Sequence, residues 1–66
     1  MDAQKYTERV KESGLKKTFI ADKLGISYQS YLNREAGKYD FTASEIAQLK
    51  VILGLSNKDI AEIFLA

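Results

Sequence analysis

The sequence contains no cysteine, no histidine and no proline. Without cysteine the chain has no disulfide and no thiol nucleophile, and without histidine it lacks imidazole acid–base chemistry and the ligands of an ordinary zinc site. Carboxylates and lysines remain as candidate catalytic groups, but Asp22, Glu35 and Glu45 each have a simpler role on a helix face, in a salt bridge or in a cap. Gly-rich phosphate loops are missing as well. We therefore expect no enzyme activity, no cofactor and no metal.

Neither a membrane span nor a secretory signal is predicted. No stretch approaches about eighteen apolar residues, and the first residues lack the apolar core of a signal peptide. The 66 residues allow one core, so we expect a single domain over residues 1–66, which would bury only about 60% of its unfolded surface. We expect a cytoplasmic protein with no membrane partner, no small-molecule ligand domain, and modest stability to which a second subunit could add.

The net charge of +1 and the sequence pI near 7.9 fall short of the strongly basic values usual for nucleic-acid binders. The charge is unevenly distributed, however. Residues 1–38 hold eight Lys or Arg against five Asp or Glu, whereas residues 39–66 hold two against four. The first part of the chain is therefore suited to face phosphates while the second faces away.

Residues 17–37 predict two short helices joined by a tight turn, the signature of a helix-turn-helix. The first helix has the spacing of one apolar face, with these buried positions: Phe19 or Ile20, Ala21 and Leu24. Gly25 can adopt the positive φ that ends it. Ser27 is placed to cap the second helix, and Ile26 is placed to pack on Tyr31 as a hydrophobic staple.

The exposed face of the second helix is polar, with Arg34 nearby, and consists of Tyr28, Gln29, Ser30 and Asn33. Side-chain amides donate and accept at once, as the N6 and N7 atoms of adenine require in the major groove. This face therefore predicts contacts to DNA bases. The simpler alternative is a solvated polar helix.

Three further helices are predicted, together with no strand pattern and no low-complexity linker. Their approximate limits are residues 2–12, 42–54 and 57–65. Asp2 is placed to cap the first of them, in which Tyr6 and Val10 have the spacing of a buried stripe. Capping boxes, in which a Ser or Thr is followed three residues later by an acid, mark the other two starts at Thr42 and Ser56. The predicted fold class is all-α, a compact bundle of about five short helices.

The final helix is unusually apolar for the end of a small domain, through Ile60, Ile63, Phe64 and Leu65. These side chains cannot all point the same way, so part of them could form a dimer interface. The alternative is that all of them fold back onto the domain's own helices.

The chain resembles a known family through an ordered set of short motifs: Leu15, Ile20-Ala21, Lys23-Leu24-Gly25-Ile26-Ser27, Gly37-Lys38, Phe41, Glu45-Ile46, Leu49, Leu53-Gly54-Leu55 and Ile63-Phe64. This set resembles the Cro/repressor-type (XRE-like) helix-turn-helix regulators, in particular small Firmicute prophage repressors. The resemblance implies a lambda-repressor-like bundle in a bacterial host, whose third helix enters the major groove and whose dimers bind pseudo-palindromic operators.

The resemblance also implies residue roles. Tyr28, Gln29 and Asn33 match the base-reading face of the third helix, and Ser30 lies beside them. Lys17 matches the polar residue that touches the DNA backbone at the start of the second helix, and Lys38 matches a phosphate contact after the third. The complete set of expected backbone contacts is Lys16, Lys17, Thr18, Ser27, Arg34, Lys38 and Tyr39.

One departure from the family pattern lies near the end of the third helix, where an apolar residue is usual and this chain has Asn33-Arg34-Glu35-Ala36. Two explanations are open. Leu32 could take over the packing, or Glu35 could sit partly buried against Arg9. The start of the preceding helix is also poorly capped, because it has Lys where Asn or Ser is common.

Two functions of different classes follow. The first is a sequence-specific regulator, expected to act as a homodimeric repressor on double-stranded DNA. The second is a protein-binding module of the antitoxin or antirepressor type, which would use the apolar final helix on a partner. The near-neutral charge favours the second slightly, and the amide-bearing face favours the first.

Overall fold

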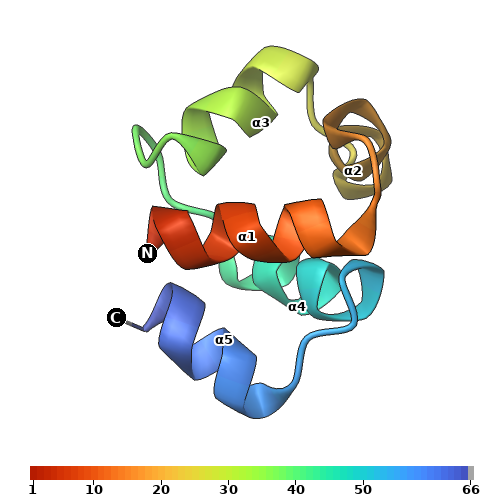
Figure 1. The fold of residues 1–66 in the computed structure, drawn as a ribbon. Coiled ribbons are helices and arrows are strands. Elements are labelled where there is room, and N and C mark those ends of the chain that lie inside the picture. The colour runs from red at the N-terminus through yellow and green to blue at the C-terminus, as the bar shows by residue number, and fades with distance from the viewer. Residues whose placement is uncertain (66) are drawn as a thin grey trace.

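Five α-helices joined by short turns make up residues 1–65, the part of the chain that the computed structural model describes (Figure 1). They are α1 (Ala3–Ser13), α2 (Lys17–Leu24), α3 (Tyr28–Glu35), α4 (Ala43–Ile52) and α5 (Asn57–Phe64). Figure 1 shows α1 in the middle, with α2 and α3 on one side and α5 on the other. No strand occurs within residues 1–65. The prediction of an all-α bundle of about five short helices is confirmed.

The helix starts follow the predicted caps. The Asp2 carboxylate accepts a bond from the Lys5 backbone N–H at 3.1 Å, and complete capping boxes form at Thr42 and at Ser56. In the second box, hydrogen bonds from Ser56, mainly its backbone N–H, lower the pKa of the Asp59 carboxyl. The start of α2 has no side-chain cap, as expected from a lysine at the cap position, Lys16. Local sequence therefore defines where four of the five helices begin.

The core lies where α1 meets the other helices. Its most deeply buried side chains are Tyr6, Ile20, Tyr31, Leu49 and Ile63. Of the two alternatives in α2, Ile20 is the buried residue, whereas Phe19 keeps 44% of its surface exposed. Within residues 1–65, no helix combines the length and apolar content needed to cross a membrane.

The final helix folds back onto the domain. Ile63 is 1% exposed, and the Phe64 ring lies 6.0 Å from Tyr6 and 6.1 Å from Phe41, edge-on to both. The backbone N–H of Asp2 also donates to the carbonyl of Ile63 at 2.6 Å. Ile60 is partly buried against the same core, so Leu65, at 79%, is the exposed member of the predicted interface set. Ile63 was therefore wrongly assigned to a dimer interface, because it is buried where α5 packs against α1.

Candidate nucleic-acid interface

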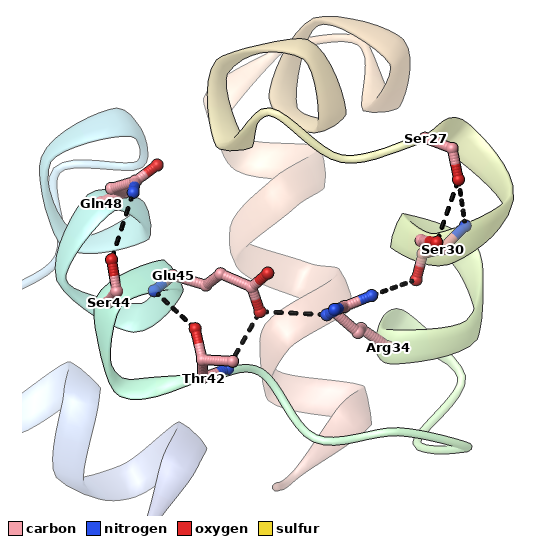
Figure 2. A network of polar contacts seen from close by, with 7 residues as sticks. All are labelled: Ser27, Ser30, Arg34, Thr42, Ser44, Glu45 and Gln48. Carbon is pink, nitrogen blue, oxygen red and sulfur yellow. Dashed lines mark hydrogen bonds and ion pairs between the residues drawn. The ribbon is translucent and has the colours of Figure 1, made fainter.

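The turn between α2 and α3 has the predicted geometry. Gly25 has a φ of 71°, and its N–H donates to the carbonyls at the end of α2. The N–H of Ile26 reaches back to the Ala21 carbonyl at 3.2 Å, which closes the helix end. The hydroxyl of Ser27 then accepts from the Ser30 N–H at 3.1 Å and starts α3 (Figure 2). These bonds fix how α3 leaves α2.

The exposed face of α3 carries two amides that bond to each other. Tyr28 and Gln29 are exposed, and Ser30 and Asn33 are partly buried. The Nε2 of Gln29 donates to the Oδ1 of Asn33 at 3.1 Å. This leaves the Gln29 oxygen free as an acceptor and the Asn33 amide nitrogen free as a donor. The pair thus presents one acceptor and one donor from adjacent turns of a helix, the complement of adenine N6 and N7.

Two hydroxyls at the start of α3 are partly used by the protein itself. The Ser27 Oγ donates to the Ser30 Oγ at 3.0 Å, in addition to capping the helix (Figure 2). Ser27 therefore has a structural role besides the predicted backbone contact. Ser30 keeps its place beside the amide pair but is less accessible than Gln29.

Arg34 does not face the predicted DNA side. Its Nε donates to the Glu45 Oε1 at 3.0 Å, and its Nη1 donates to the Ser30 carbonyl at 3.2 Å (Figure 2). Its side chain is 20% exposed. The same Glu45 oxygen accepts from the Thr42 N–H at 2.9 Å. Arg34 thus ties α3 to the cap of α4, and we remove it from the expected phosphate contacts.

A chain of side-chain hydrogen bonds links α1, α3 and α2. Lys17 Nζ contacts Glu35 Oε1 at 2.7 Å, and the Tyr31 hydroxyl donates to Glu35 Oε2 at 3.0 Å. The Tyr6 and Tyr31 hydroxyls lie 2.8 Å apart. Because the Tyr31 proton goes to Glu35, Tyr6 is the donor in that pair. The hydrogen bond to Glu35 also raises the pKa of Lys17. This chain joins the start of α2 to the end of α3.

The departure from the family pattern thus has a structural explanation. Glu35 is partly buried, as one alternative held, but its partner is Lys17 and not Arg9, which pairs with Asp59 at 2.6 Å. Leu32 also packs partly buried against the core, as the other alternative held. Both of the open explanations therefore hold in part.

The remaining expected backbone contacts lie exposed at the two ends of the helix-turn-helix. They are Lys16, Thr18, Lys38 and Tyr39. The Lys38 ammonium lies 5.9 Å from the centre of the Tyr39 ring, and within residues 1–65 neither Lys16 nor Lys38 is in an ion pair. Lys17 forms an ion pair with Glu35 but keeps 41% of its side chain exposed. The motif therefore offers free cations at both ends and a neutral amide pair between them.

Among residues 1–65, no group of three or more carboxylates could hold a metal ion. Comparison with protein-family models, with curated proteins and with solved structures finds no match to the chain. The resemblance to Cro/repressor-type regulators therefore rests on the sequence motifs.

Proposed function

We propose that this chain is a sequence-specific DNA-binding protein, a transcriptional regulator that places α3 in the major groove of an operator. The observation that carries the proposal is the surface pair of exposed Gln29 and partly buried Asn33, hydrogen-bonded to each other at 3.1 Å on an uncharged helix face. On a solvated helix, an amide pair four residues apart would add only a small stabilisation, about 0.2–0.5 kcal/mol. On a helix that enters the major groove, the same amides supply both the acceptor and the donor that an adenine edge pairs with.

The cations around the pair have a different role in this proposal. Lys16 precedes α2 and Lys38 follows α3, so phosphate contacts from these exposed side chains would hold the ends of the motif on the backbone. Such contacts set the position of the protein but select no sequence. Bound protein would repress by excluding polymerase, which requires no catalytic chemistry.

The alternative of a protein-binding module depended on the apolar surface of α5. Most of that surface is covered by the domain itself, because Ile63 is buried and Ile60 and Phe64 pack against the core. The amide pair, in contrast, is on the surface. We therefore prefer the DNA-binding function.

Selection of binding sites from a random duplex library at two salt concentrations tests the proposal. We expect enrichment of a short motif that persists at the higher salt, because base contacts depend less on salt than phosphate contacts do. Binding that is abolished by salt and enriches no motif would overturn the proposal.

A further inference from the structure

The solvent face of α4 carries no charge. Its exposed positions recur at helical spacing and are Ala43, Ser44, Ala47, Gln48 and Val51. Val51 is 82% exposed. The two charged residues of α4 point elsewhere, because Glu45 is buried in the capping box and the Lys50 ammonium contacts Asn57. In a chain in which 29% of residues are charged, a whole uncharged helix face is typical of an interface, whose centre is depleted of charge.

This face also carries a shallow depression that is wide open to solvent. Ser44, Ala47, Gln48 and Val51, with Ile52 beside them and Lys23 from α2, line a wide, open groove of about 450 Å³. Lys23 is the one charged residue of that lining, and its ammonium lies 5.4 Å from the centre of the Phe19 ring.

We propose that this α4 face binds the same face of a second copy of the chain about a twofold axis. Identical copies repel wherever like charges meet. The exposed residues of α4 carry no charge, so Lys23 of α2 is the one cation of the lining that could face its own copy. A partner selected by charge would find Lys23 alone to pair with. The small side chains Ser44 and Ala47 let two helices approach closely.

The polar groups on the face suit an identical partner. The Gln48 Nε2 lies 3.4 Å from the Ser44 Oγ in the same helix, a long and weak bond (Figure 2). Amides and hydroxyls donate and accept at once, so in an antiparallel pair of α4 helices Gln48 of each copy can bond Ser44 of the other. A twofold interface needs this reciprocity.

The α4 face and the α3 face do not compete, because no residue lining the groove belongs to α3. Two copies joined through α4 therefore keep Gln29 and Asn33 accessible. The dimer itself is argued from α4 alone. Only its consequence, an operator with two half-sites, rests on the proposed function.

The dimer should be weak. The α4 helix has 10 residues and is about 15 Å long, so the contact falls at the small end of protein interfaces. We expect a Kd between about 10 μM and 1 mM.

Sedimentation equilibrium of the free protein tests this interface with a matched pair of substitutions. Ala47 on α4 and Ala61 on α5 are both exposed, and Ala47→Lys and Ala61→Lys add the same charge to a helix surface. Lysine is a good helix former, so both variants should fold, which circular dichroism checks. Ala47→Lys places two ammonium groups near the twofold axis, and we expect it to weaken the dimer at least about tenfold.

Ala61→Lys should leave the dimer unchanged. A wild-type chain that stays monomeric up to about 1 mM, or an Ala61→Lys effect as large as that of Ala47→Lys, would overturn the α4 interface. No DNA is present in this experiment, so its result is independent of the search for an operator.

Discussion

At the residue scale, two buried tyrosine hydroxyls connect α1 to α3 inside the core. Tyr6 and Tyr31 are fully buried, yet the chain through Glu35 gives each hydroxyl a partner. Among residues 1–65, no buried side-chain nitrogen or oxygen lacks a hydrogen bond. Burial raises the pKa of Tyr6 to about 12 and raises that of Tyr31 as well, because a phenolate would lose its hydration there.

Stability should therefore fall in alkali. Unfolded tyrosines ionise near pH 10, whereas Tyr6 in the folded protein ionises near pH 12, so between these values the unfolded state binds fewer protons. The free energy of unfolding should fall by up to about 1.4 kcal/mol per pH unit for each buried tyrosine. Urea unfolding at a series of pH values measures this slope.

In Tyr6→Phe the fall of the unfolding free energy with pH should be clearly shallower. Tyr39→Phe is the control, because this ring is exposed in the loop after α3, and it should leave the slope unchanged. Equal slopes for wild type and Tyr6→Phe would contradict the role of the buried hydroxyl chain.

At the scale of the elements, the helices and their caps could be predicted from sequence, but most contacts between helices could not. A cap or a turn, such as that at Gly25, depends on residues within about four positions. The ion pair of Arg34 with Glu45 depends on how two helices pack, and so does that of Lys17 with Glu35. The same holds for α5, whose periodicity left open which apolar residues meet α1. For Glu35 the sequence left two explanations open, and the one that buried this carboxylate paired it with Arg9, whereas the structure pairs it with Lys17.

The ion pair between α2 and α3 leads to a prediction about DNA affinity. Glu35→Gln keeps an oxygen that can accept from Tyr31 but releases Lys17, which should then contact phosphate more fully. We expect tighter binding to any duplex and a salt dependence steeper by about one unit of log K per log salt for each copy. Stability should fall by less than about 1 kcal/mol, because Lys17 is partly exposed. Fluorescence anisotropy with a labelled duplex over a salt series measures the effect.

Glu62→Gln is the control, since it removes the same charge from α5, on the other side of α1 from α3 (Figure 1). If the two variants change affinity and salt dependence equally, Glu35 is not holding Lys17 back from DNA.

At the scale of the whole molecule, two surfaces with different chemistry lie on different helices. The α3 face presents amides flanked by free cations, and the α4 face is uncharged and carries a shallow depression. The described body measures 28 × 23 × 20 Å, which suits one copy for each half-site when half-sites lie about 34 Å apart. With a net charge of only +1, bulk attraction to phosphate would be weak, so the proposed DNA binding would have to depend on base contacts and on a second copy.

The most direct test of base reading by α3 is to repeat the duplex selection with Gln29→Ala and compare its enriched motif with that of the wild type. We predict that preference is lost at one base pair in each half-site, at a cost of about 1 to 3 kcal/mol there, while the rest of the motif persists. Lys38→Ala is the control variant, and it should weaken binding to every sequence and leave the motif unchanged. An unchanged motif for Gln29→Ala would contradict the docking of α3 in the major groove.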